Sequence, residues 1–169
     1  PKKLGFDWSQ EGIVAISAKN IKNGRFINQD DVKFVSDELY KKWMKSDLKK
    51  GDILITSEAP CGELLYLHKD WQLCLSQRLF CVRPDINRIT PGYLYYSLCS
   101  DHIQYELSSR ETGTTVTGIR QSLLRTVPVL TPPLQLLMKI ELIFSTILDK
   151  IHQNEDESRI LSVYRDTLL

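Results

Sequence analysis

The sequence predicts an α+β protein, with a mixed, mostly antiparallel sheet domain carrying short helices, followed by one long C-terminal helix. Two observations support this class. The strand patterns lie close together in the chain, without the crossover helices that parallel pairing needs. From Leu134 onward the chain contains no Gly or Pro, so nothing in it forces a helix to stop. We therefore expect a domain over residues 1–130 and a helical segment over residues 131–169.

Short apolar or alternating runs predict the strands of the domain. They cover residues 12–17, 25–27, 53–56, 63–67, 73–75, 79–83 and 127–130. Between the first two, the polar turn 19–25 contains Asn23 and Gly24, which adopt a positive φ easily. Residues 49–52, Lys-Lys-Gly-Asp, form the turn that leads into the next strand.

The predicted short helices cover residues 36–44, 90–98, 102–107 and 121–124. Ser36 caps the first of them, and Thr90 with Pro91 supplies the cap and first turn of the second. Residues 111–118 are too rich in Thr and Gly for a helix, so we expect a loop there.

The long helix has a plausible start and an apolar seam. Thr131 can cap it, and Pro132 and Pro133 fit its first turn, where an N–H has no intrahelical partner to lose. A fully helical segment would be roughly 50 Å long. Its apolar residues step by three and four, the spacing of a coiled-coil seam. The seam comprises Leu137, Ile140, Phe144, Ile147, Ile151, Asn154, Leu161 and Leu168.

Two interpretations of this helix are open. It could be an ordinary amphipathic helix that packs only on its own domain. Its length and its strongly apolar start favour pairing with a second helix from elsewhere. In that case the polar Asn154 would fix the register of the pair, because one buried Asn specifies alignment at some cost in stability.

Composition indicates an ordinary globular protein, with 42% hydrophobic residues, 25% charged residues and a net charge of +1. No apolar run approaches the roughly 20 residues of a membrane span, and no apolar block follows the N-terminal lysines as in a signal peptide. The four cysteines form no C-x-x-C pair and the three histidines are far apart. We expect a cytoplasmic protein with reduced cysteines and no metal site.

Catalytic motifs do not occur in the sequence. It lacks the phosphate-binding G-x-x-x-x-G-K-[ST], the dinucleotide-binding G-x-G-x-x-G and the nucleophile turn G-x-S-x-G. An amine methyltransferase would need a motif such as Asn-Pro-Pro-Tyr, and a nuclease would need clustered carboxylates with a lysine. We expect a non-catalytic chain without a cofactor, whose associated chemistry belongs to a partner.

Five segments in order resemble the target recognition domain in the specificity subunit of type I restriction-modification enzymes. They are residues 16–27, 49–56, 75–79, 91–98 and 113–134. Each motif alone is weak, but five in order over nearly the whole chain are specific. The family often places Glu-Gln two residues after its Pro-Pro-Leu, where this sequence has Leu136 and Leu137.

The resemblance implies a division of labour. One recognition domain reads one half of a split target in double-stranded DNA. The long helices of two halves pack antiparallel as a coiled-coil spacer, while modification and restriction subunits carry methylation and ATP-driven cleavage. This chain would be half a subunit, the second half, paired with another half or a second copy. Two alternatives are the recognition domain of a fused restriction-methyltransferase, and a coiled-coil interaction module without a DNA role.

DNA-contacting residues are expected in loops that carry paired donors and acceptors, because Arg suits guanine and Asn or Gln suits adenine. The candidates are Lys19, Asn20, Lys22, Asn23, Arg25, Ser57, Glu58, Gln77, Arg78, Thr114, Thr115, Thr117, Arg120 and Gln121. Each could also be part of a merely solvated turn. Arg83, Arg88 and Arg110 are expected to be phosphate contacts or surface charges.

Overall fold

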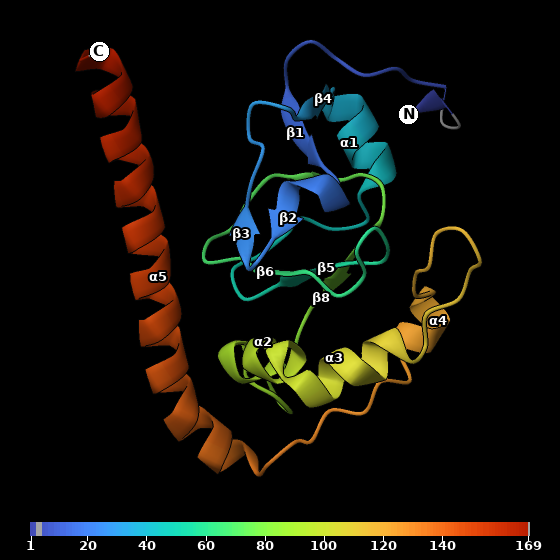
Figure 1. The fold of residues 1–169 in the computed structure, drawn as a ribbon, viewed down its shortest axis with the longest axis vertical. Coiled ribbons are helices and arrows are strands. Elements are labelled where there is room, and N and C mark those ends of the chain that lie inside the picture. The colour runs from blue at the N-terminus through green and yellow to red at the C-terminus, as the bar shows by residue number, and fades with distance from the viewer. Residues whose placement is uncertain (3–4, 169) are drawn as a thin grey trace.

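The computed structural model describes residues 1–2 and 5–168 and confirms the predicted order, a mixed domain and then a long helix (Figure 1). The strands are β1 (Ile13–Ile16), β2 (Ile21–Lys22), β3 (Arg25–Phe26), β4 (Lys33–Val35), β5 (Ile53–Thr56), β6 (Leu64–Tyr66), β7 (Cys74–Leu75) and β8 (Leu79–Val82). The helices are the 3-10 helix η2 (Ala18–Asn20), α1 (Asp37–Trp43), α2 (Pro91–Cys99), α3 (Asp101–Ser108), α4 (Gln121–Leu124) and α5 (Leu134–Leu168). Leu169, at the end of the predicted helix, lies outside the described residues.

The strands form three small sheets that are mostly antiparallel, as predicted. In the first, β1 lies between β4, which is antiparallel to it, and β7, which is parallel. β2 and β3 form a hairpin, and β5 pairs antiparallel with both β6 and β8. Because β1 and β7 run in the same direction, the loops that follow these two strands emerge at the same end of the sheet.

The structure differs from the local predictions in several places, including strand β2 and the 3-10 helix η2, which lie where a polar turn was expected. Residues 127–130 form no strand, and Pro128 within them has no N–H to donate to a neighbouring strand. Strand β4 is not among the predicted strands, because a run of three residues is too short to show an alternating pattern. The Thr131 hydroxyl donates to the Val129 carbonyl (3.2 Å) and does not cap α5, which begins at Leu134.

Strand β5 lies between the two main cores of the domain. The side chains of Ile53 and Ile55 pack with helices α2 and α3, whereas Leu54 packs on the opposite side with β1 and β2. All three are fully buried, and burial of each such side chain stabilises the fold by about 1.5–3 kcal/mol. This central strand therefore holds the helical layer and the first sheet together.

An ion pair between Asp52 and Arg83 holds the chain in place just before β5 begins. The Asp52 carboxylate is buried and accepts hydrogen bonds from Arg83 Nε (2.7 Å) and Nη2 (2.6 Å). Burial raises the pKa of Asp52, but these bonds and one from the Lys49 N–H outweigh burial and hold the pKa below its ordinary value. Arg83 is exposed, as a surface charge would be, and its pairing with Asp52 also gives it a structural role.

The first half of α5 packs on its own domain across α2. Leu137 and Leu148 are buried, and the centroid of the Phe144 ring lies 4.7 Å from that of Tyr96. The interpretation of α5 as an amphipathic helix on its own domain thus holds for this half.

Glu141 of α5 joins this contact to the N-terminus of α2. Its carboxylate accepts hydrogen bonds from the Gly92 N–H (2.9 Å) and the Tyr93 N–H (3.3 Å). A carboxylate at a helix N-terminus stabilises by about 0.3–1 kcal/mol. A Cβ atom on Gly92 would lie 2.8 Å from the Phe144 Cβ, so glycine is what permits this close approach.

The predicted seam residues of α5 do not all lie on one side of the helix. Leu137 and Phe144 face the domain, whereas Ile147 and Ile151 remain 44% and 42% exposed. Other apolar side chains are exposed on the same half of the helix: Leu136, Met138, Leu142 and Ile143. From position 156 to 168 every side chain is exposed, and the last turns of α5 leave the domain (Figure 1).

Candidate nucleic-acid interface

Four polar loops meet on one side of the domain, and we call them together the loop edge: residues 17–20, 57–59, 76–78 and 112–120. Backbone hydrogen bonds join them side by side. The Ala18 N–H donates to the Gln77 carbonyl (3.2 Å). The Ser57 N–H donates to the Arg78 carbonyl (2.9 Å), and the Ser57 carbonyl accepts from the Ile119 N–H (2.8 Å).

The loop 112–120 is closed at a narrow neck, where Thr112 and Gly118 face each other. Thr112 and Gly118 exchange two backbone hydrogen bonds of 2.8 and 3.1 Å. A Cβ atom on Gly118 would lie only 2.6 Å from the Ser57 carbonyl oxygen, so glycine lets the neck sit against the 57–59 loop. Beyond the neck the side chains point to solvent, and the exposed candidates there are Thr114, Thr115 and Thr117. Figure 1 shows this loop projecting from the domain beside α4.

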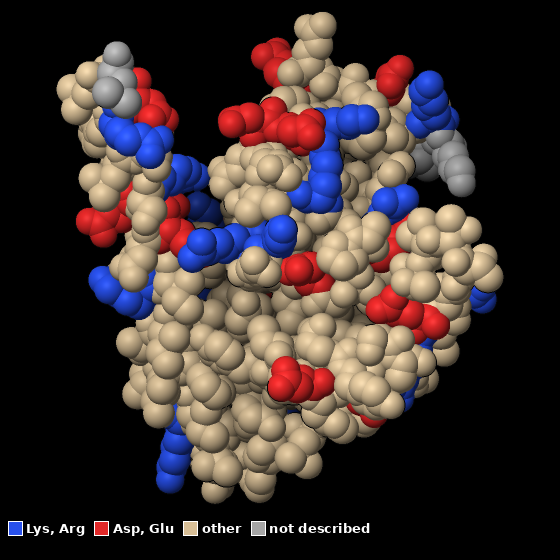
Figure 2. Space-filling model, viewed as in Figure 1, with Lys and Arg blue, Asp and Glu red and all other residues tan. Residues whose placement is uncertain are grey.

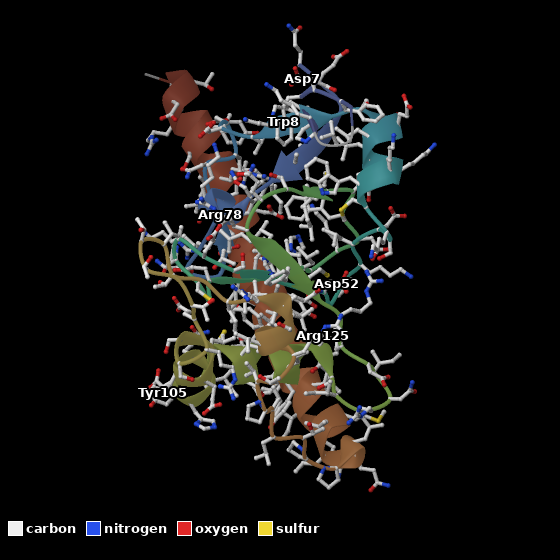
Figure 3. All side chains as sticks on the ribbon, turned by 90° about the vertical axis from the view of Figure 1, so that its right-hand side faces the viewer. Asp7, Trp8, Asp52, Arg78, Tyr105 and Arg125 are labelled. Carbon is white, nitrogen blue, oxygen red and sulfur yellow. The ribbon has the colours of Figure 1, made fainter. Side chains whose placement is uncertain are left out.

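The loop edge gathers most of the predicted DNA-contacting residues. They are Lys19, Ser57, Glu58, Gln77, Arg78, Thr114, Thr115 and Thr117, with Arg120 and Gln121 where the last loop enters α4. Each of these residues is exposed or half-buried. In Figure 3, Arg78 lies between Trp8 and the loop that precedes α4.

A cavity of about 850 Å³ adjoins the loop edge and adds residues that the sequence reasoning missed. Its lining includes Lys19, Gln77 and Arg78, together with Trp8 and Lys33. The Lys33 ammonium lies 4.8 Å from the centroid of the Trp8 ring. No motif marks these two residues in the sequence. Lys33 reaches the cavity through the pairing of β4 with β1, and Trp8 through the bridge between Ser9 and Phe34.

A second group of predicted residues lies on the β2–β3 hairpin, and the structure does not bring it into the loop edge. The Asn23 N–H donates to the Glu63 carboxylate (2.6 Å), and Asn23 has the positive φ expected of it. Arg25 Nε lies 2.9 Å from a carboxylate oxygen of Glu155 on α5. Lys22 is exposed on the same hairpin.

Asn20 has a structural role in the same region. It is 1% exposed, and its side-chain oxygen accepts from the Ser17 N–H (3.0 Å). Its amide nitrogen donates to the carbonyls of Ile27 (3.4 Å) and Asn28 (3.2 Å). These bonds hold the turn together and engage both the oxygen and the nitrogen of the Asn20 side-chain amide.

Two ion pairs shape the electrostatics of the loop edge. Lys19 pairs with Asp31, and its hydrogen bond and charge hold the pKa of Asp31 below the ordinary value. Arg78 Nε lies 2.6 Å from Glu58 Oε1. Basic and acidic groups thus alternate here, as they do over the upper part of the face in Figure 2.

A second cavity, of about 450 Å³, lies between α5 and the β2–β3 hairpin. His152 of α5 is buried beside it and stacks on His68, with ring centroids 4.0 Å apart. His152 Nδ1 lies 3.4 Å from Glu155, the residue that also pairs with Arg25. Burial and the neighbouring His152 lower the pKa of His68.

Within the part of the chain that the structure describes, no three or more His, Cys, Asp or Glu side chains are placed to hold a metal ion. The helices of that part include none with the length and apolar content to cross a membrane. All four cysteines are free thiols.

Two solved structures share this fold. The HsdS subunit from Thermoanaerobacter tengcongensis is 17% identical, with a TM-score of 0.56 over 97% of this chain and 40% of that one. A chain from a study of assembly and conformational transition in the type I R-M system is 16% identical, with a TM-score of 0.56 over 98% of this chain and 40% of that one. This chain therefore spans about 40% of the length of either.

No curated protein matches the chain in sequence. Residues 2–160, by contrast, match the sequence profile described as "Type I restriction modification DNA specificity domain". That match covers nearly the whole chain, including the loop edge and most of α5. The chain therefore belongs to the family of type I restriction-modification DNA specificity domains.

Proposed function

We propose that this chain is a non-catalytic reader of one half of a bipartite DNA target, in which the loop edge contacts the duplex. The observation that carries the proposal is the convergence of four loops, distant in sequence, in a chain that belongs to a DNA specificity family. The exposed side chains there are the types that hydrogen-bond to base edges and phosphates.

The β2–β3 hairpin would add contacts to the phosphate backbone. Lys22 is exposed there, and the described residues offer it no carboxylate within ion-pair distance. A lysine without a partner is free to release a counterion from a phosphate, whereas Arg25 would first have to leave Glu155.

The outward side of α5 would dock the second half-site reader, either another recognition half or a second copy of the chain. Leu136, Ile143 and Ile147 are exposed there, and the lower part of the face in Figure 2, over α2 and the first turns of α5, carries few charges. Modification and restriction subunits would then supply methylation and cleavage to the assembled reader.

A salt titration of duplex binding tests the proposal. The full chain should bind duplex DNA with an affinity that falls as salt rises, and Lys22→Ala should reduce the slope of log K against log salt by about one unit. Lys139→Ala, a change to an exposed lysine on α5, is the matched control and should leave the slope unchanged.

The same titration separates the alternatives. Duplex binding that is absent, or insensitive to salt, would favour an interaction module without a DNA role. An unchanged slope in Lys22→Ala would remove the hairpin from the interface but leave the loop edge in place.

A further inference from the structure

We infer that Arg78, oriented by Glu58, reads a guanine in the major groove of the target half-site. This inference rests on the proposed DNA-binding function and assigns one base-specific contact within it. Three features of the pair carry the inference: a constrained backbone, an exposed ion pair, and a charge balance that disfavours phosphate.

The backbone of Arg78 is held in a conformation that a non-glycine residue rarely adopts. Its φ is +65°, in the left-handed region. Such residues persist where the surrounding structure holds them, and they cluster at binding sites. The Arg78 carbonyl accepts the Ser57 N–H (2.9 Å), and the preceding Gln77 carbonyl accepts the Ala18 N–H (3.2 Å). Arg78 is thus fixed from two neighbouring loops.

The side chain of Arg78 is exposed and held by Glu58, and its ion pair contributes little to folding. Its Nε lies 2.6 Å from Glu58 Oε1, and the two side chains are 47% and 33% exposed. An ion pair as exposed as this contributes little to stability. Glu58 is held in turn by an antiparallel bridge to Gly118, where an added Cβ atom would lie 2.7 Å from the Glu58 Cβ. The pair therefore lies where three of the four loops meet, residues 57–59, 76–78 and 112–120.

Glu58 favours a base over a phosphate as the ligand of Arg78. Its carboxylate balances the charge of the guanidinium and repels a phosphate that approaches the same place. With Nε beside the carboxylate, the two terminal nitrogens remain as a fork of donors. That fork matches the O6 and N7 acceptors of guanine, the commonest specific contact of arginine in the major groove. Glu58 also limits the rotamers of Arg78, so less entropy is lost on binding.

Selection from a random duplex library tests the assignment. The full chain should enrich a motif with an invariant guanine. Arg78→Ala should lose that preference by on the order of 10- to 100-fold while the rest of the motif persists. Arg78→Gln should lose it as well and shift toward adenine, which suits a glutamine side chain. Glu58→Gln should weaken the preference less.

Two controls distinguish a loss of guanine recognition from a loss of folded protein. Arg125→Ala removes another exposed arginine, labelled with Arg78 in Figure 3, and should leave the motif unchanged. Thermal unfolding of both Arg78 variants should match that of the wild type. If Arg78→Ala does not fold, Arg78→Gln carries the test, because it retains a long polar side chain at the same backbone position.

Base analogues test which guanine atoms Arg78 contacts. Replacing the invariant guanine with 7-deazaguanine removes N7 and should weaken the wild-type chain, but not Arg78→Ala. Inosine keeps O6 and N7 and should bind like guanine. Retention of the guanine preference in Arg78→Ala, or tolerance of 7-deazaguanine by the wild type, would overturn the assignment. If the wild-type chain enriches no sequence and shows no salt-sensitive duplex binding, the proposed function itself fails.

Discussion

Arg120 and Gln121 stand where the loop 112–120 becomes α4, and both side chains are exposed. The Arg120 carbonyl accepts the N–H groups of Leu123 (3.0 Å) and Leu124 (2.9 Å), so the backbone at this point is fixed by the first turn of the helix. Side chains on a fixed backbone lose less freedom when they bind. After Arg78, we therefore propose this pair as the next base contacts on the loop edge.

Substituting either residue with alanine should separate base from phosphate contact. Arg120→Ala or Gln121→Ala should weaken binding of the cognate duplex by about 1–3 kcal/mol if the side chain reads a base. Binding of random duplex, measured in the same gel-shift series, should change little. An equal loss on both DNAs would show contact with phosphate alone.

The two asparagines of the first turn, Asn20 and Asn23, show which residue properties the sequence predicts and which it does not. Asn23 has the positive φ that its type predicts, because that preference is local. Asn20 lies three residues earlier and is buried, with bonds to Ser17, Ile27 and Asn28. Its burial depends on residues 27–28, which follow β3 and return over Asn20, and the composition of the turn alone does not show that return.

Helix α5 makes a contact whose contribution to stability depends on pH. His68 packs beside His152 of α5, and Lys69, Glu155 and Asp156 also act on its charge. The pKa of His68 is lowered, first by burial and then by His152. The folded state therefore keeps His68 neutral at pH values where the unfolded chain already binds a proton.

The pH dependence follows from that difference. The stabilisation is fully present above the unfolded pKa of about 6.5 and is lost as pH falls from there through the lowered folded value. Urea unfolding of the wild type should show stability rising with pH across this window, by at most about 1.4 kcal/mol per pH unit from this one group. His68→Asn should flatten that rise.

His102, exposed on α3, provides the matched control for this experiment. His102→Asn should leave the pH dependence as it is in the wild type. A rise that survives in His68→Asn would show that the junction between α5 and the hairpin does not depend on the protonation of His68.

Across the whole molecule, the direction of the apolar side chains on α5 decides how two readers could be joined. Leu137 and Phe144 pack inside the chain, which leaves a stripe of Leu136, Ile143 and Ile147 for a partner helix. The predicted seam is therefore divided, with part of it used within the chain. Paired antiparallel through such a stripe, two helices of roughly 50 Å would set the separation of two half-sites.

Charged substitutions on that stripe test the pairing. The wild-type chain should sediment as a dimer at micromolar concentration, and Ile143→Arg combined with Ile147→Arg should convert it to a monomer, because a charge in an apolar seam is not desolvated without large cost. Met138→Arg, an equally charged change on another side of α5, should leave the dimer intact. A dimer that survives the double substitution would place the contact elsewhere.

The sequence by itself determined the local features of this protein. An uninterrupted run without Gly or Pro predicted α5, and apolar runs between polar turns predicted most strands, because both depend on neighbours along the chain. Only the tertiary structure decided which loops meet. The parallel pairing of β1 with β7 brings residues 17–20 beside 76–78, and the Ser57–Ile119 hydrogen bond joins segments about sixty residues apart. The sequence places such residues far apart, so their convergence depends on strand topology and packing rather than on local preference.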